Sequence, residues 1–277
     1  YTVGERVDYN MVFRYKNDFL LRSMSHYEEF IKKMEQECLY EHMGVHGRPQ
    51  VSVIPFYDPF ASTTIDLMHC CDLGVIARFV SIWTSKTSKY FVKGKKLEDL
   101  NSIMVNLQPP NNLKRAIRPL SDVNNYKAQE YSSFCLYIFP ILMDEFLQKQ
   151  YYEHFFLLSF ALSIFHKNTI SSGDLDLATI ALHNFVSKIE SLYGPKHLTH
   201  NTHLLLHLPH VLKNLGTLKE INGYNFENCN GKVRNYIHGC NNVAKEIQKR
   251  FSFDFDRKLF NLKNKMKETS VLKHRHT

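Results

Sequence analysis

The most apolar stretch of this sequence is EFLQKQYYEHFFLLSFALSIFH, residues 145–166. Within it, residues 155–165 are almost wholly apolar, but two serines interrupt them and they fall short of the ~18 apolar residues that a membrane span needs. We therefore predict that residues 145–166 form a helix buried in a protein core, and we expect no membrane partner.

Helical patterns lie on both sides of this stretch. The apolar spacing predicts further helices over residues 20–38, 66–85, 97–107, 122–139, 172–193, 201–215, 226–238 and 243–251. Asp122 is expected to cap the helix that it begins, and Pro140 to kink or break the chain after it. Short apolar and β-branched segments predict strands over residues 51–57 and 218–221. The predicted fold class is mainly α, of the α+β type.

The composition indicates a folded protein of one large domain or two modest ones. Of the 277 residues, 44% are hydrophobic and 13% aromatic, which is enough for a sizeable core and excludes wholesale disorder. The six cysteines show no Cys-x-x-Cys spacing and lie in apolar or helical surroundings. They indicate a reducing compartment and buried free thiols rather than a disulfide framework.

The positive charge is confined to one end of the chain. Residues 228–277 hold 12 Lys and Arg against 4 Asp and Glu, which accounts for the whole formal charge of +8. A one-sided basic segment is typical of proteins that bind the phosphate backbone of nucleic acids. The residues expected to do so are Lys232, Arg234, Lys245, Lys249 and Arg250. A solvated helix and tail would give the same pattern.

Asp66 and His69 are the first candidates for chemistry, at the start of a predicted helix that follows a predicted strand. From that edge an aspartate can direct its carboxylate into a cleft, and a histidine three residues later lies on the same face of the first helical turn. The spacing alone favours a plainer interpretation, in which Asp66 caps the helix and His69 is half-buried.

Glu227 is the second candidate. It is followed on the same predicted helix by Lys232 and Arg234, so a carboxylate able to bind a metal would lie within about two turns of a phosphate-binding face. The alternative is an ordinary acidic residue at a helix N-terminus, where the helix dipole favours negative charge.

A histidine stripe is the third candidate, formed by His200, His203, His207 and His210. The spacings place all four on one helix face, and His203 and His207 can reach one metal ion. No glutamate stands between them as in His-Glu-x-x-His metalloproteases, and leucines alternate with them, which favours packed or hydrogen-bonded histidines. A helical protein with a metal site on this stripe is therefore a separate hypothesis.

Taken in order, several segments over about residues 40–250 resemble transposases of the CACTA (En/Spm) type. They are GVHG at 44–47, PFYDP at 55–59, IDLMHC at 65–70, LGV at 73–75, YKAQEY at 126–131, YYEHF at 151–155, LTHNTHLLLHL at 198–208, FENCNGK at 226–232 and HG at 238–239. Each segment is weak alone, but the series is fairly specific.

This resemblance implies a fold that is a partial ribonuclease-H-like core with a large helical insertion. Residues 51–85 and 216–251 would form parts of the core, 86–215 the insertion, 1–50 a helical lead-in and 252–277 a basic tail. It also implies two-metal phosphoryl transfer on DNA in the nucleus, with Asp66 and Glu227 as ligands of Mg²⁺ or Mn²⁺ and His69 as an orienting residue. No organic cofactor is implied; DNA and a second copy of the chain are the expected partners.

The first aspartate of the family's catalytic triad has no clear counterpart in this sequence. Asp8 and Asp18 lie in polar surroundings without a clean strand pattern. The chain begins with Tyr1 rather than Met, so one expectation is a piece of a longer protein that supplies this aspartate upstream. The alternative is a decayed or domesticated copy, a scaffold that binds DNA or protein without catalysis.

Overall fold

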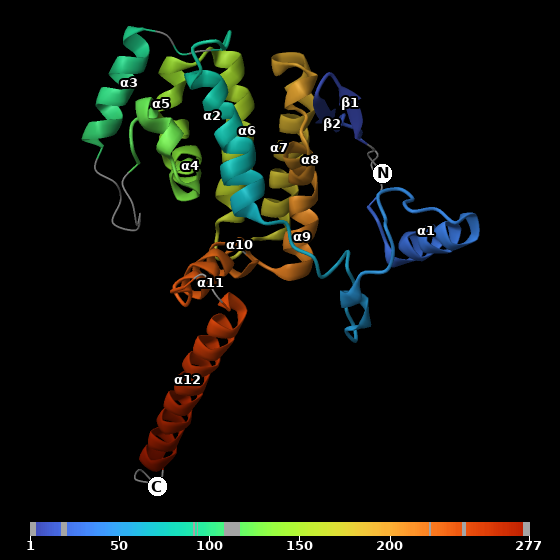
Figure 1. Cartoon of the computed structure of the whole chain (residues 1–277). Helices are drawn as coiled ribbons and strands as arrows, with labels where there is room; N and C mark the ends of the chain where they lie inside the picture. The colour runs from blue at the N-terminus through green and yellow to red at the C-terminus, as the bar shows by residue number, and fades with distance from the viewer. Residues whose placement is uncertain are drawn as a thin grey trace. The chain divides into compact units, whose positions relative to one another are not determined.

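The computed structural model describes residues 4–17, 21–90, 92, 94–107, 117–221, 223–239 and 242–273; for residues 52, 219, 220 and 263–273 it describes only the backbone. The chain divides into two compact units, Tyr1–Asn222 and Gly223–Thr277. Each unit is taken by itself below. Helices make up most of the described chain (Figure 1), so the prediction of a mainly α fold is confirmed.

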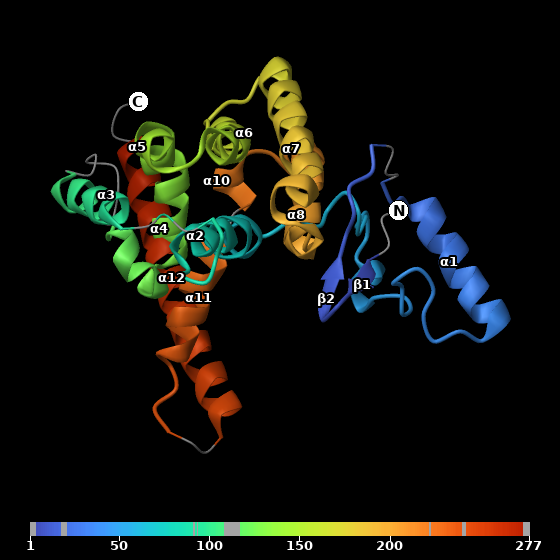
Figure 2. The same ribbon diagram turned by 90° about the horizontal axis from the view of Figure 1, so that it is seen from above.

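Two long helices form the centre of the first unit. α6 (Lys149–Phe165) and α7 (Ser172–Tyr193) lie side by side and share one apolar core (Figures 1 and 2). Ser171 caps α7 through a hydrogen bond from the backbone N–H of Asp174 (3.1 Å), and Gly194 ends it with a φ of 92°. The apolar stretch that predicted a buried helix therefore forms α6, with Phe155 and Phe165 fully buried.

A second group of helices packs against this pair. η2 (Met68–Ile76) is a π-helix that continues as α2 (Ala77–Thr84), and it contacts α4 (Ala128–Ser133). α4 leads through a second π-helix, η4 (Phe134–Ile138), into α5 (Phe139–Phe146). Pro140 lies in the first turn of α5, directly after η4, so the chain stays helical through Pro140 and the expected break does not occur. π-Helices are rare, and the two in the described chain, η2 and η4, both contribute side chains to the same apolar core.

The remaining elements of the first unit surround these helices. They are β1 (Glu5–Val7), β2 (Asn10–Val12), α1 (Met24–Glu37), η1 (Gln50–Val53), α3 (Lys95–Asn106), η3 (Leu120–Asn125), η5 (Pro195–His197), α8 (His200–Leu204), η6 (Leu205–His207), α9 (Leu208–Leu215) and α10 (Leu218–Ile221). β1 and β2 pair antiparallel, with Arg6 opposite Met11. α1 packs on a small core of its own, which includes Tyr27, Phe30 and Val45.

Both predicted strands are wrong. Residues 50–53 form the short 3₁₀-helix η1, and residues 218–221 form α10. Pro49 and Pro55 remove backbone donors on either side of η1, and Phe56 has a φ of 63°, which no strand accepts. In the described chain, β1 and β2 are the strands, so neither segment has a sheet to join.

The second unit consists of α11 (Tyr224–Arg234) and α12 (Val243–Lys273). α12 is longer than predicted, since it continues through residues 252–273, where a basic tail was expected. Tyr236 joins the two helices by donating its hydroxyl hydrogen bond to Asp254 Oδ2 (2.5 Å). α11 has no buried side chain among the residues described, so this unit has little core of its own.

Three of the described cysteines, Cys70, Cys71 and Cys135, are buried free thiols, as predicted. The hydrogen bond with Cys70 and burial raise the pKa of Cys71, and burial raises the pKa of Cys135, so both thiols stay protonated. Cys38 and Cys229 are also free but are exposed, so the prediction of burial is wrong for these two.

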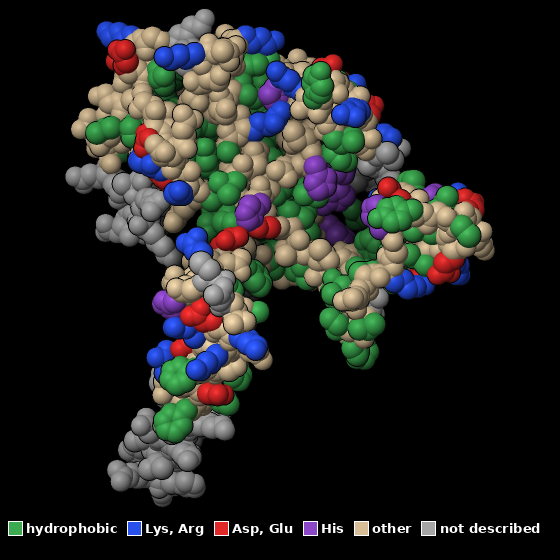
Figure 3. Space-filling view, viewed as in Figure 1, with side chains coloured by type: hydrophobic (Ala, Val, Ile, Leu, Met, Phe, Trp, Pro, Cys, Tyr) green, Lys and Arg blue, Asp and Glu red, His purple; other side chains and the backbone are tan. Residues whose placement is uncertain are grey.

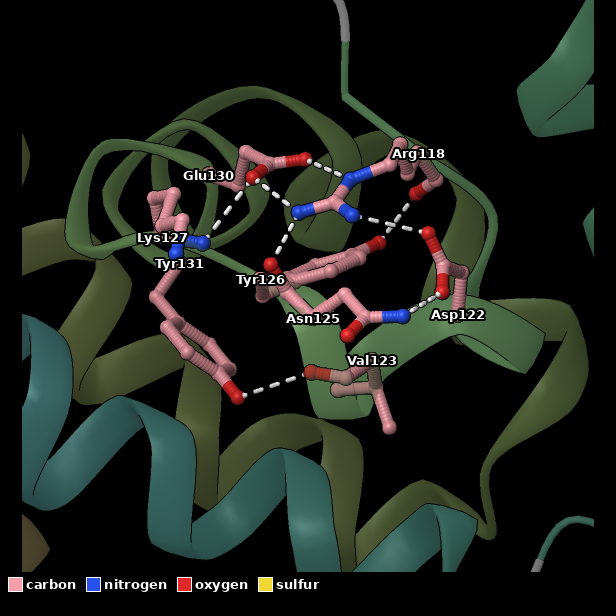
Figure 4. Close-up of polar contacts among 8 residues, drawn as sticks. All are labelled: Arg118, Asp122, Val123, Asn125, Tyr126, Lys127, Glu130 and Tyr131. Carbon is pink, nitrogen blue, oxygen red and sulfur yellow. Dashed lines mark hydrogen bonds and ion pairs between the residues drawn. The ribbon is translucent and has the colours of Figure 1, made fainter.

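A buried ion pair holds the start of α4 (Figure 4). Glu130 is 1% exposed, and its carboxylate accepts hydrogen bonds from Arg118 Nε (2.8 Å) and Nη2 (2.7 Å) and from the backbone N–H of Lys127 (2.9 Å). Arg118 Nη1 also donates to Asp122 Oδ2 (2.9 Å). Asp122 therefore lies inside η3 and binds Arg118, and its predicted role as the cap of a long helix is wrong.

Glu130→Gln is expected to lower the free energy of unfolding by about 2 kcal/mol at pH 7, because a buried carboxylate with charge-assisted hydrogen bonds is lost. Hydrogen bonds from Arg118 lower the pKa of Glu130 from 4.5 to about 2. The difference in the free energy of unfolding between wild type and variant is therefore largest above about pH 4.5, and it decreases as the pH falls towards 2. Urea unfolding followed by the fluorescence of Trp83, the one tryptophan, measures it.

The matched control is Glu153→Gln, which removes an exposed carboxylate that lies 3.7 Å from Lys149 on α6. Exposed pairs of this kind contribute little, so no resolvable change is expected. An equal effect of both substitutions at pH 7 would contradict the assignment of Glu130 as a buried structural carboxylate.

Candidate functional site

Asp66 and His69 are brought together at the start of η2. Asp66 Oδ1 accepts a hydrogen bond from the backbone N–H of Met68 (3.0 Å), and Oδ2 lies 2.5 Å from His69 Nδ1. The Asp66 side chain is 38% exposed and that of His69 57% exposed. The Met68 hydrogen bond is a helix-capping contact, which the plainer interpretation predicts. His69, however, is exposed rather than half-buried.

This arrangement orients a carboxylate and an imidazole at the protein surface. The contact with Asp66 fixes which nitrogen of His69 faces the carboxylate, and the backbone N–H of Met68 holds the other carboxylate oxygen. Such a pair can bind a metal ion through the carboxylate or transfer a proton through the ring. The predicted strand before Asp66 is absent, since residues 63–66 have no regular structure.

Glu227 belongs to the second unit, in the first turn of α11. Its side chain is exposed, and its backbone N–H donates to Gly223 O (3.0 Å). An acidic residue in the first turn is favoured by the helix dipole, as the alternative interpretation states. Asp66 and Glu227 thus lie in separate units, and each has its own local setting.

The five predicted DNA-binding side chains are all exposed in the second unit: Lys232, Arg234, Lys245, Lys249 and Arg250. Arg250 Nη2 lies 3.4 Å from Glu246 Oε1, so part of its charge is neutralised on its own helix. Lys245 and Lys249 are four residues apart on α12 and form no ion pair with any described residue. Figure 3 shows Lys and Arg side chains on this unit beside exposed hydrophobic side chains.

The histidine stripe lines a cavity of about 450 Å³ in the first unit. His203 Nε2 and His207 Nε2 lie 3.1 Å apart, and His210 Nε2 contacts the side-chain amide of Asn214 (3.0 Å). Burial lowers the pKa of His203 to about 4 and also lowers the pKa of His207, so both rings are neutral at pH 7. Figure 3 shows histidine side chains gathered at a hollow on this face.

Phe13 is a contributor to this cavity that the sequence did not single out. Its backbone N–H donates to Leu198 O (2.8 Å). This hydrogen bond places Phe13, which directly follows β2, against the helical segment that carries the histidine stripe. Its ring stacks on His203 at 5.6 Å with an interplanar angle of 17°. No local pattern connects residue 13 with residue 203, so the contact could be found only in the folded chain.

Among the described residues, no three His, Cys, Asp or Glu side chains lie close enough together to hold a metal ion. Nor is any helix of the described chain both long enough and apolar enough to cross a membrane. Comparisons with protein-family models, with curated proteins and with solved structures found no match for this chain.

Two segments that carry the transposase resemblance pack directly on each other. Cys70 Sγ donates to Asn201 O (3.4 Å), and η2 contacts α8. A Cβ on Gly74 would collide with the side-chain amide of Asn201 on α8 and would lie 2.7 Å from His69 O in its own helix. The helix that carries His69 therefore leaves no space for a side chain at Gly74.

Gly74→Ala is expected to destabilise the first unit by about 1–3 kcal/mol, because the new methyl group collides with the His69 carbonyl of its own helix and displaces the Asn201 side chain. Gly173→Ala is the matched control, since a Cβ at that helical position meets no atom within 4 Å. Alanine favours the helix, so the control is expected to be neutral or slightly stabilising. Trp83 fluorescence in urea compares the two variants, and a harmless Gly74→Ala would refute the close approach.

Proposed function

We propose that this chain is part of a DNA-processing protein of the transposase type, which acts by two-metal phosphoryl transfer on DNA. The observation that carries the proposal is the exposed Asp66 carboxylate, held at a helix start and oriented by His69. The transposase resemblance assigns metal-binding roles to Asp66 and Glu227. In such chemistry two Mg²⁺ or Mn²⁺ ions about 4 Å apart stabilise the attacking and the leaving oxygen.

The residues have separate tasks in this proposal. Asp66 and Glu227 supply carboxylate oxygens, which are the ligands that Mg²⁺ prefers. His69 is a positioning residue, because its ring nitrogen contacts the Asp66 carboxylate and so limits the directions in which that carboxylate can point. A further carboxylate is required to complete the triad, and we propose that the intact protein supplies it.

We extend this proposal to the fold of the chain. A partial ribonuclease-H-like core interrupted by a helical insertion is supported by the order of the matching segments. The helices α3 to α9 occupy most of the region that the resemblance assigns to the insertion. We also propose a nuclear location, where the DNA substrate is found, and a second copy of the chain as a partner.

The second unit supports a role in holding DNA. Its exposed lysines and arginines can neutralise backbone phosphates without reading the bases, so they would position DNA rather than select a sequence. Lys245 and Lys249 lie on one face of α12 and are the strongest candidates, since no described acidic residue pairs with them.

A catalytically inactive scaffold is the second candidate function. It is favoured by the exposed aromatic side chains of α12, Phe251, Phe253, Phe255 and Phe260, which are 56–68% exposed. Exposed aromatic groups next to basic ones are typical of surfaces that bind another macromolecule. This function would need DNA or protein binding but no metal ions.

Mutation of the proposed ligands tests the enzymatic function. Asp66→Asn and Glu227→Gln are each expected to reduce Mn²⁺-dependent DNA strand cleavage by the intact protein about a hundredfold, because each removes a ligand of the metal pair. Asp176→Asn, at an exposed position on α7, should leave cleavage unchanged. If the intact protein binds DNA but cleaves none with Mg²⁺ or Mn²⁺, the scaffold is the correct function.

Salt dependence tests the DNA contact. Lys245→Ala and Lys249→Ala are each expected to weaken binding about equally for all DNA sequences, because phosphate contacts carry no sequence information. Each should also lower the slope of log K against log salt by about 1. Lys188→Ala, an exposed lysine of α7, is the control. Fluorescence anisotropy with duplexes of unrelated sequence measures both quantities, and an unchanged slope would remove these lysines from the interface.

A further inference from the structure

His203 and His207 direct the same ring nitrogen at one point. Their Nε2 atoms lie 3.1 Å apart, and their rings stand nearly perpendicular, with an interplanar angle of 76° and centroids 4.9 Å apart. The DNA-processing function proposed above makes no use of either ring. The pair therefore needs an explanation of its own.

We propose that His203 and His207 form a binding site for a divalent transition-metal ion such as Zn²⁺, Ni²⁺ or Cu²⁺. Imidazole nitrogens bind these ions at about 2.0–2.1 Å, so two ligands of one ion lie about 2.9 Å apart at a right angle and about 3.4 Å apart in a tetrahedron. The observed separation of 3.1 Å falls between these values. An ion can therefore bridge the two rings with only small movements of either side chain.

The protein already holds one ring in place. Phe13 stacks on His203 with ring centroids 5.6 Å apart, and its backbone N–H is anchored by Leu198 O. Both histidines also lie on a helical segment that is half-buried, which restricts their rotation. Preorganised ligands lose less conformational freedom when the ion binds, so affinity rises.

The cavity beside the pair leaves room for the remaining ligands. Its volume of about 450 Å³ accommodates several water molecules, and His200 and His210 also line it. Since no three potential ligands cluster among the described residues, water or an incoming donor group would complete the coordination. Arg22 lines the same cavity, but its Nη2 donates to Met43 O (2.6 Å). The site is thus an open one.

Proton balance is simple at this site. Both rings are neutral at pH 7, so each carries one proton, on either Nδ1 or Nε2. When the ion binds, each ring carries its proton on Nδ1, so both Nε2 lone pairs become ligands. No oxidation or reduction is involved, and no proton has to be lost.

The test uses the whole chain, stripped of metal with a chelator and titrated with ZnCl₂ in a calorimeter. Wild type is expected to bind Zn²⁺ at this pair, and His203→Ala and His207→Ala are each expected to weaken that binding about tenfold or more. His46→Ala, far along the chain and outside the cavity, is the matched control and should bind as wild type does. Trp83 fluorescence without metal shows whether each variant folds.

Electron paramagnetic resonance of the Cu²⁺-loaded wild type needs no variant and so covers the case in which His203→Ala unfolds. Hyperfine splitting from two imidazole nitrogens is expected. Wild type that fails to bind Zn²⁺ or Cu²⁺ at millimolar concentration, or folded variants that bind as wild type does, would show that the pair is a histidine–histidine hydrogen bond only. Neither readout depends on DNA cleavage, so the site and the proposed function can fail independently.

Discussion

The core of the first unit depends on the aromatic contacts that the ring of Phe79 makes. This ring is fully buried, and its centroid lies 4.9 Å from Tyr193, 5.4 Å from Phe185 and 5.6 Å from Phe155. These rings come from α2, α6 and α7, so one cluster sets the separations of three helices. His154 is buried beside it with its pKa lowered to about 4 by burial, and its Nε2 contacts Phe185 O (2.8 Å). A neutral histidine thus serves as part of the core.

The helices could be predicted because their signals are local. The apolar stripe of α7 lies between Ser171 and Gly194, within one segment, and the helix predicted over residues 172–193 is observed there. The predicted strands failed because a strand is stable only when a partner pairs with it, and β-branched residues such as Val51 and Val53 do not reveal that partner. The π-helical turns before Pro140 likewise left no local sign in the pattern.

The same difference between local and long-range signals is found in the candidate site. The Asp66–His69 contact spans three residues, and helical spacing was sufficient to place both on one face, although the sequence favoured a half-buried His69 where the side chain is exposed. The stacking of Phe13 on His203 joins positions that are far apart in the chain, and the burial of Glu130 by Arg118 requires the fold of the loop between them. Such contacts depend on tertiary packing, which composition and periodicity do not encode.

The π-helix η2 has a consequence for how this protein tolerates changes in length. A π-turn holds an extra residue compared with an α-turn, and the segment Met68–Ile76 stores it between the surface pair Asp66–His69 and the buried helix α2. Loss of one residue there would allow an ordinary α-helix to form. Because the π-turn already absorbs the extra residue, the residues on its N-terminal side would keep their faces of the helix. A single codon deletion within η2 would therefore leave both the Asp66–His69 pair and the aromatic core in register, a tolerance that a regular α-helix at this position lacks.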